Sequence, residues 1–216
     1  MDALKNCSGS RYNSMETEPF IYPGAEALRW QGRNITSQFG EDGYIAAALE
    51  QIGSTNKWCF EVGATDGLFF SNTKHWRDMG WNAVLIESDP LAFDKLLAYR
   101  NPPRVVCLHR RVVPAGMDSL DCILRDHRVP LNLDLGVIDI DGQDYYVWEG
   151  MIVFRPRLML VEYSPYGSPD DLPAVWGEGQ AGLNPILALG NRKGYLPLVR
   201  TACNVLFARA DIWQQQ

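Results

Sequence analysis

The chain has 216 residues, of which 46% are apolar or aromatic and 21% are charged, which predicts one globular domain and excludes a disordered chain. A formal charge of −6 disfavours nucleic acid as the partner, because most of the surface would repel phosphates. The sequence contains no apolar run long enough to span a membrane and no secretory-type apolar segment near its start, so we expect no membrane contact and a cytoplasmic location.

Residues 1–36 show no sustained hydrophobic period and predict an N-terminal arm ahead of a domain at residues 37–216. In that domain, amphipathic helical patterns alternate with short apolar strands. The expected helices lie near 44–52, 71–80, 89–97, 119–125, 144–151 and 183–191, and the expected strands near 58–63, 82–87, 105–108, 135–140, 158–163, 195–199 and 204–208. The short link at 200–203 requires a hairpin, so one strand near the sheet edge should be antiparallel. The alternation predicts a doubly wound α/β sheet, whose ligands bind at the carboxyl ends of the strands.

The first strand of the expected domain ends in an ExGxxxG pattern from Glu61 to Gly67. Glycines there allow close approach of the backbone to a ligand. Glu61 stands where the GxGxxG dinucleotide fingerprint has its first glycine, so its carboxylate would oppose a pyrophosphate and suits a cationic ligand. Twenty residues after Gly67, Glu87 ends the next strand, where an acid can accept both hydroxyls of a ribose. Together they predict a site for a nucleoside without phosphates, such as S-adenosylmethionine (SAM); the alternative is that both acids are incidental polar strand ends.

The strand near 135–140 is followed by three carboxylates, Asp139, Asp141 and Asp144. Asp139 and Asp141 would share one side of an extended chain, where they could bind Mg²⁺ or take a proton from a substrate. The alternative is that Asp141 or Asp144 caps the next helix while only Asp139 faces the pocket. Glu162 adds an acid to the same rim, and His109, directly after the third strand, is another candidate base.

Six short blocks of sequence occur in a characteristic order. They are SQFGEDG at 37–43, FEVGA at 60–64 with Asp66-Gly67, SNT at 71–73, Gly80-Trp81 before LIE at 85–87, IDIDG at 138–142 with Asp144-Tyr145, and Arg155-Pro156 before VEY at 161–163. In this order the blocks resemble the FkbM-type SAM-dependent methyltransferases, from residue 37 to about 208. The resemblance implies the Rossmann-like class I methyltransferase fold, a seven-stranded, mostly parallel sheet in the order 3-2-1-4-5-7-6, with strand 7 antiparallel and helices on both faces.

The resemblance also implies an activity, O-methylation of a hydroxyl on a small molecule or sugar of secondary metabolism. Pattern and resemblance together give the expected cofactor contacts Gln38, Glu61, Gly63, Ala64, Asp66, Gly67, Ser71, Asn72, Glu87, Ser88 and Asp139. The acceptor would bind between the N-terminal arm and the loop at 164–182. Two other functions stay open, a non-catalytic cofactor-binding scaffold and a nicotinamide-dependent oxidoreductase, and so does a homo-oligomeric state.

Overall fold

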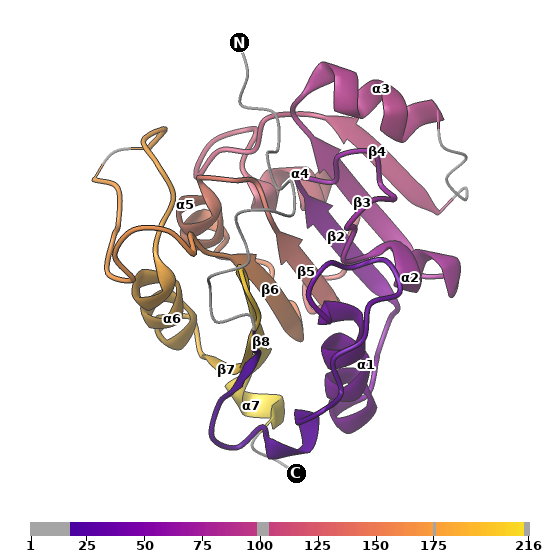
Figure 1. Cartoon of the computed structure of the whole chain (residues 1–216). Helices are drawn as coiled ribbons and strands as arrows, with labels where there is room; N and C mark the ends of the chain where they lie inside the picture. The colour runs from indigo at the N-terminus through magenta and orange to yellow at the C-terminus, as the bar shows by residue number, and fades with distance from the viewer. Residues whose placement is uncertain (1–17, 99–103, 175, 214–216) are drawn as a thin grey trace.

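The computed structural model describes residues 18–98, 104–174 and 176–213, which form helices on both sides of an eight-stranded sheet (Figure 1). The strands are β1 (Phe20–Ile21), β2 (Trp58–Val62), β3 (Asn82–Glu87), β4 (Val105–His109), β5 (Leu135–Ile138), β6 (Leu158–Glu162), β7 (Tyr195–Arg200) and β8 (Asn204–Arg209). The helices are η2 (Glu26–Leu28, 3-10), α1 (Glu41–Ile52), α2 (Lys74–Asp78), α3 (Pro90–Ala98), α4 (Leu120–Asp126), α5 (Asp144–Gly150), α6 (Leu183–Arg192) and α7 (Ala210–Trp213). In the part of the chain described, no helix combines the length and hydropathy needed to cross a membrane.

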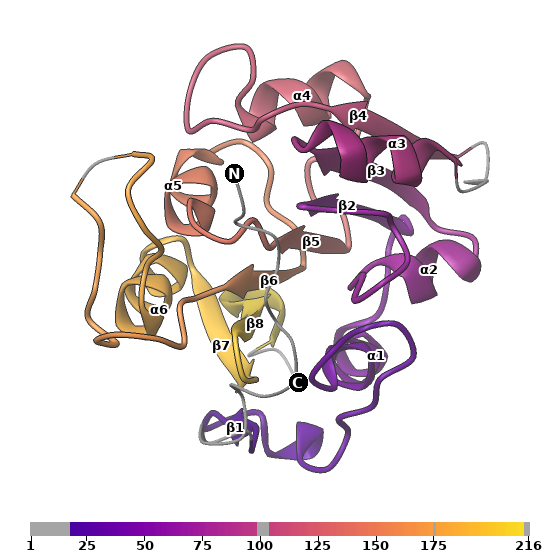
Figure 2. The same ribbon diagram turned by 45° about the horizontal axis from the view of Figure 1, so that its top comes forward.

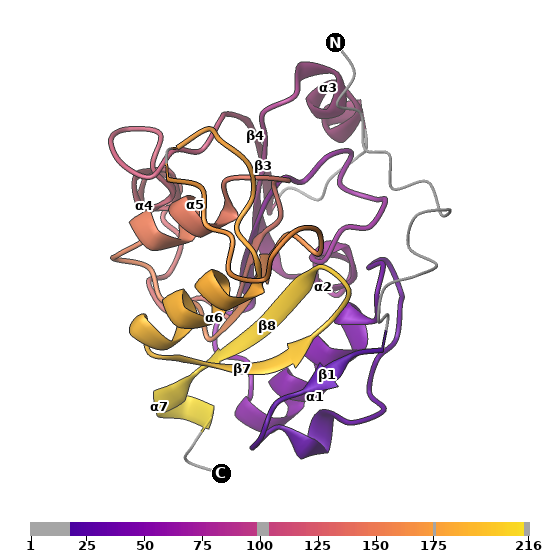
Figure 3. The ribbon, with the colours of Figure 1, turned by 60° about the vertical axis from the view of Figure 1, so that its left-hand side comes forward.

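The strands lie in the order β1-β7-β8-β6-β5-β2-β3-β4. Neighbours among β2 to β6 pair in parallel, whereas β8 is antiparallel to both β6 and β7. Counted as strands 1 to 7, β2 to β8 lie in the order 3-2-1-4-5-7-6 that the resemblance implies, and the expected hairpin at 200–203 joins β7 to the antiparallel β8. The expected count of seven strands is wrong, because Phe20 and Ile21 pair with Arg200 and Val199 and add β1 at the edge (Figure 3).

Two apolar layers bury the two faces of the sheet. Leu124 of α4, Trp148 of α5 and Ile186 of α6 belong to one layer. Ile45 of α1, Trp76 of α2 and their neighbours from α3 and α7 belong to the other. Figure 2 shows α5 and α6 on one side of the sheet and α1 and α2 on the opposite side. Because β2 to β6 are parallel, their carboxyl ends meet at one edge, where a ligand site is expected.

The expected N-terminal arm contributes to this fold from residue 18 onward. Besides β1, it supplies Ala25 and Leu28, which are buried in the layer that contains α1. The nitrogen Nε1 of Trp213 donates to the Gly24 carbonyl at 2.9 Å and ties the arm to α7. Residues 1–17 of the expected arm lie outside the described residues.

Candidate functional site

The turn after β2 packs closely against the end of β5. Gly63 has φ +84°, and a Cβ there would lie 1.8 Å from the carbonyl oxygen of Asp139. Gly67 has φ +72°, and its Cβ would lie 2.5 Å from Cδ1 of Leu96 on α3. We expected these glycines to make room for a ligand. Within the described residues they make room for Asp139 and Leu96. Their positive φ angles are a second reason why glycine occupies these two positions.

Glu61 is buried beneath this turn and binds the block at 71–73. Its carboxylate accepts hydrogen bonds from Ser71 Oγ (2.7 Å), Thr73 Oγ1 (2.6 Å) and the Asn72 amide (2.8 Å). The buried Arg77 donates to Ser71 Oγ at 3.2 Å. Glu61, Ser71 and Asn72 are therefore brought together as predicted, but as a network that holds the chain before α2. The Oδ1 atom of Asn72 is buried and has no hydrogen-bond partner among the described residues.

Glu87, at the end of β3, is also buried and binds backbone. Its Oε2 accepts from the Thr65 amide at 2.7 Å, and its Oε1 accepts from the amides of Ser88 (2.7 Å) and Asp89 (2.8 Å). A carboxylate has roughly four acceptor positions, so about one of them remains for a ligand. Glu87 thus joins the glycine turn of β2 to the end of β3.

The other residues of the glycine turn shape it locally. Asp66 accepts from the amides of Leu68 and Phe69 through Oδ1, both at 2.9 Å. The amide of the buried Ala64 donates to the carbonyl of Ile86 at 3.1 Å, which holds the turn against β3. The Asp66 carboxylate therefore sets the conformation after Gly67.

Gln38 lies in the loop that leads into α1. Its carbonyl accepts from Asn34 Nδ2 at 2.9 Å, and its side chain is half-buried. In the same loop, Thr36 Oγ1 donates to the Ser71 carbonyl at 2.9 Å. The loop of Gln38 is therefore anchored to the block at 71–73.

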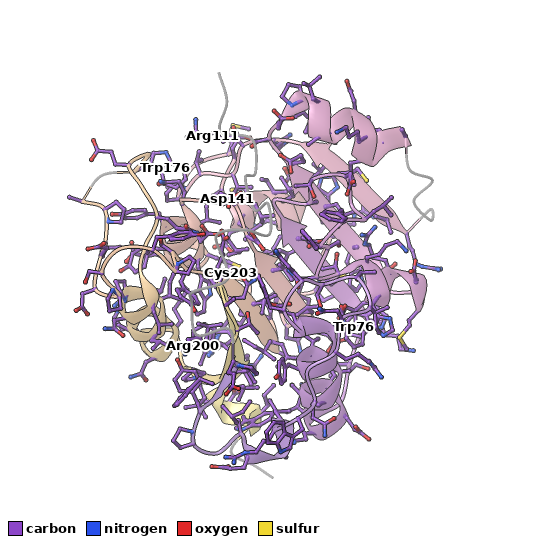
Figure 4. All side chains as sticks on the ribbon, viewed as in Figure 1. Trp76, Arg111, Asp141, Trp176, Arg200 and Cys203 are labelled. Atoms are coloured by element: carbon purple, nitrogen blue, oxygen red, sulfur yellow. The ribbon has the colours of Figure 1, made fainter. Side chains whose placement is uncertain are left out.

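Four carboxyl groups follow β5 and β6: Asp139, Asp141, Asp144 and Glu162. The strand β5 ends at Ile138, and Asp141 has φ +53°, so the argument that Asp139 and Asp141 share one side of an extended chain does not apply. The Asp141 amide donates to Oε2 of Glu162 at 3.0 Å. Asp139 is half-buried and Asp141 (Figure 4) is exposed, whereas Glu162 is buried.

Asp144 holds the loop between β5 and α5. Its Oδ1 accepts from the Ile140 amide at 2.9 Å and its Oδ2 from the Gly142 amide at 3.1 Å, so it binds the preceding loop instead of capping the helix. Burial raises the pKa of Asp144 to about 7, and the neighbouring Asp139 acts in the same direction. Burial also raises the pKa of Glu162 well above its usual value, with Asp139 and Asp144 adding to the effect. The cluster therefore takes up protons more readily than isolated carboxylates do.

His109 lies apart from these acids. Its Nε2 is 3.1 Å from the Ser88 carbonyl oxygen, and its ring stacks on Phe93 with centroids 5.0 Å apart. The strands β3 and β2 separate β4 from β5, which at about 4.8 Å per strand gives a distance on the order of 14 Å. The candidate catalytic residues thus form two groups, the acids at β5 and β6 and His109 beside Glu87.

Binding of Mg²⁺, one of the two roles that the sequence leaves open for Asp139 and Asp141, finds no support. Among the described residues, no group of three or more His, Cys, Asp or Glu side chains is arranged to hold a metal ion. Both oxygens of Asp144 and Oε2 of Glu162 already accept backbone hydrogen bonds. Asp144 and Glu162 therefore hold loops, and Asp139 and Asp141 by themselves do not supply the several oxygen ligands that a hard cation needs.

Three features of this edge have no counterpart among the expected site residues. Thr65, with φ +49°, links the glycine turn to Glu87, and Thr73 and Arg77 complete the network of Glu61. A cavity of about 240 Å³ also opens beyond β6 and is lined in part by the 164–182 loop. Thr65 lies in the ExGxxxG pattern and Thr73 in the block at 71–73, whereas Arg77 lies in none of the blocks, and only the fold shows which atoms these residues bind.

No model of a protein family matches this sequence, and no curated protein does. Similar solved structures include a SAM-dependent methyltransferase from Aquifex aeolicus, 11% identical, with a TM-score of 0.45 over 76% of this chain and 88% of that one. A TehB-like SAM-dependent methyltransferase from Corynebacterium glutamicum is 10% identical, with a TM-score of 0.46 over 84% of this chain and 92% of that one. A SAM-dependent methyltransferase from Clostridium acetobutylicum is 7% identical, with a TM-score of 0.48 over 78% and 90%. At such identities and TM-scores, none of these proteins assigns an activity to this chain.

Proposed function

We propose that this protein is a SAM-dependent methyltransferase that methylates a hydroxyl group of a small molecule. The observation that carries the proposal is the link between the glycine turn of β2 and Glu87 of β3, through the hydrogen bond from the Thr65 amide. This link places a left-handed turn beside a buried carboxylate at the carboxyl ends of two adjacent parallel strands. Nucleoside-bearing ligands bind at this place in α/β sheets.

The groups around this turn fit SAM by their chemistry. They offer acceptors, namely the Glu87 and Asp139 carboxylates and the Oδ1 atom of Asn72, which no described residue donates a hydrogen bond to. SAM carries donors to match them, two ribose hydroxyls and an ammonium group, together with a positive sulfonium. An acceptor-rich, acidic surrounding opposes the pyrophosphate of a nicotinamide dinucleotide, and this disfavours the oxidoreductase alternative. When bound, SAM supplies an electrophilic methyl group.

Asp139 is the residue that we assign to proton removal from the acceptor hydroxyl. Its backbone carbonyl packs on Gly63, so its side chain directly follows the point where β5 meets the cofactor turn. It is half-buried, so a substrate can reach it. A base in hydrogen-bond reach of the hydroxyl contributes about 10²- to 10⁴-fold to the rate. Alignment of the oxygen with the methyl group contributes the rest.

Asp144 and Glu162 are positioning residues in this proposal. Asp144 binds the amides of Ile140 and Gly142, and Glu162 binds that of Asp141, so the two buried acids fix the loop that carries Asp139. His109, on the order of 14 Å away, has no part in proton removal.

Calorimetry with S-adenosylhomocysteine, SAM and NADH tests the proposal. We expect micromolar binding of S-adenosylhomocysteine, equivalent to about 8 kcal/mol, and none of NADH. The variant Glu50→Gln, which changes an exposed acid on α1, is the matched control and should bind normally. Binding of NADH in place of S-adenosylhomocysteine would refute the proposal. Cofactor binding without release of S-adenosylhomocysteine over a panel of hydroxylated acceptors would favour the non-catalytic scaffold.

A further inference from the structure

A buried asparagine lies beside the acids of β5 and β6, at the start of β8. Asn204 pairs directly with Glu162 of β6 in the antiparallel ladder, so the two side chains lie next to each other on one face of the sheet. This is the face that α1 covers, because Leu160 and Leu206, two residues away along each strand, belong to that layer. The amide that donates to Glu162 belongs to the exposed Asp141, so this edge lies close to the surface (Figure 4).

Two oxygen atoms at this edge receive no hydrogen bond from the described residues. Asn204 is 3% exposed, and its Oδ1 is buried without a hydrogen-bond partner among them. Its Nδ2 donates to Cys203 Sγ at 3.5 Å, so the oxygen is the end of the amide that a ligand would meet. Glu162 accepts the Asp141 amide through Oε2, and no described residue donates to its Oε1. A buried acceptor without a donor is costly, and a ligand that supplies the donor would account for it.

The first turn of α1 holds this edge in place. Glu41 is 1% exposed, and its Oε1 accepts from Thr201 Oγ1 at 2.8 Å. Thr201 Oγ1 also accepts from the Asn204 amide at 3.3 Å, and the Thr201 amide donates to the Asn204 carbonyl at 2.8 Å. The hairpin that carries Asn204 is therefore fixed before any ligand binds, and a further buried carboxylate lies behind it.

The charge at this edge favours a cation. Burial raises the pKa of Glu162 well above its usual value. The next largest effects come from Asp139, Asp144 and Asp141, whose negative charges raise that pKa further. A positive group placed here relieves this repulsion, and the low dielectric of a buried edge strengthens its attraction to the carboxylates. No group of described residues is arranged to hold a metal ion, whereas an alkylammonium needs only a few oxygens that accept its N–H groups.

We propose that Glu162 and Asn204 bind an ammonium group, and that this group belongs to the methyl acceptor, a small amino alcohol. The second half of the proposal rests on the proposed methyltransferase function; the ammonium site does not. Strand β5 lies between β6 and the glycine turn of β2, so an amine held at β6 is about 4.8 Å, one strand spacing, from the strand that leads to Asp139. A carbon chain of two or three atoms spans that distance. In the transfer, the acceptor oxygen bonds to the methyl carbon, the carbon–sulfur bond breaks with its electron pair left on sulfur, and the hydroxyl proton passes to Asp139.

Ethanolamine and ethylene glycol are matched probes, because they have the same number of heavy atoms and differ in one charged group. Titrated at pH 8 into the full chain without SAM, ethanolamine should shift the amide NMR signals of residues 141, 162–163 and 203–205 with millimolar affinity. Ethylene glycol should bind at least about tenfold more weakly, since it lacks the charge-assisted hydrogen bonds. Equal binding of the two probes, or shifts elsewhere in the protein, would overturn the proposal. Tighter binding of Mg²⁺ than of ethanolamine would also overturn it, because the edge would then be a metal site.

Two variants assign the binding to this edge. Asn204→Leu removes the buried oxygen and keeps a side chain of similar size, so it should lower the affinity for ethanolamine about tenfold or more without lowering Tm. Asn191→Leu, which changes an exposed asparagine on α6, is the matched control and should bind ethanolamine normally. A lower Tm with full ethanolamine binding would show that Asn204 serves only the fold, and would refute the site. If Asn204→Leu does not fold, Glu162→Gln decides: it keeps an oxygen for the Asp141 amide and removes the charge, so full ethanolamine binding would refute the site.

Turnover with SAM tests the second half of the proposal. Small amino alcohols should be methylated with a kcat/KM at least about tenfold above that of diols of the same length. Equal kcat/KM for the two classes would overturn the assignment of the ammonium group to the acceptor. Ethanolamine binding without any binding of S-adenosylhomocysteine would count against the methyltransferase and leave the ammonium site standing.

Discussion

Replacing Asp144 with asparagine should change how the stability of the protein depends on pH. Asp144 is 1% exposed, and burial raises its pKa from 3.8 to about 7. The folded protein therefore binds this proton more tightly than the unfolded chain does. The resulting stabilisation is fully present below about pH 4 and is lost as the pH rises through about 7.

The size of this effect follows from the displacement of the pKa. A displacement from 3.8 to about 7, at about 1.4 kcal/mol per pKa unit, corresponds to roughly 4 kcal/mol of unfolding free energy. Glu162 acts with the same sign because its pKa is also raised, and part of that rise comes from Asp144. Removing the charge at 144 should therefore also reduce the contribution of Glu162.

Urea unfolding at pH 5 and pH 8 measures the effect. At pH 5, Asp144→Asn should be less stable than the unchanged protein by about 1–3 kcal/mol. The asparagine side chain has only one oxygen, whereas the two carboxylate oxygens of Asp144 accept from two backbone N–H groups. Between pH 5 and pH 8 the unfolding free energy of the unchanged protein should fall by about 2–3 kcal/mol more than that of the variant, because about two pKa units of the displacement lie above pH 5. Asp121→Asn, which removes a buried carboxylate that accepts from the Ile152 and Val153 amides, should instead be destabilised at both pH values. The same pH dependence in Asp144→Asn and the unchanged protein would refute the reasoning.

Four further variants test the site. Asp139→Asn should lower kcat by about 10²- to 10⁴-fold with S-adenosylhomocysteine affinity unchanged, whereas His109→Gln should keep its kcat; the reverse result would make His109 the base. Glu87→Gln should lower the affinity for S-adenosylhomocysteine, measured by calorimetry, by about 10- to 100-fold, and an unchanged affinity would remove Glu87 from the site. Gly63→Ala should lower Tm by about 10 °C or more, because its Cβ would overlap the Asp139 carbonyl oxygen at 1.8 Å. A normal Tm would show that this turn relaxes at little cost.

The sheet could be predicted from the sequence because its signals are local. The apolar run at 82–87 became β3 with the expected bounds, and Asp89 caps α3 through a 2.7 Å bond from the Ala92 amide. Ser119 likewise caps α4. The link at 200–203 is too short for anything except a hairpin, so the antiparallel β8 was predictable as well.

Features that depend on partners distant in the chain could not be predicted. β1 is two residues long, too short to show a period of alternation, and it exists because β7 offers an unpaired edge to Phe20 and Ile21. The glycine at position 63 was attributed to a ligand. Its nearest neighbour is the carbonyl of Asp139, 76 positions further along the chain, which nothing local in the sequence reveals.

The acids were the hardest residues to interpret, because this chain uses buried carboxylates to hold its turns. Among the described residues, the buried carboxylates that accept backbone amides in this way are Glu41, Asp42, Glu61, Glu87, Asp121, Asp134, Asp144 and Glu162. Amide hydrogen bonds offset the desolvation of such a group, so an acid at a strand end is as compatible with a structural role as with a ligand. Exposure separates the two roles: after β5 and β6, Asp144 and Glu162 are buried, while Asp139 and Asp141 reach the surface. Of the two that a substrate can reach, Asp139 alone has its backbone against the Gly63 turn. This contact is the reason why we assign removal of the acceptor's proton to Asp139.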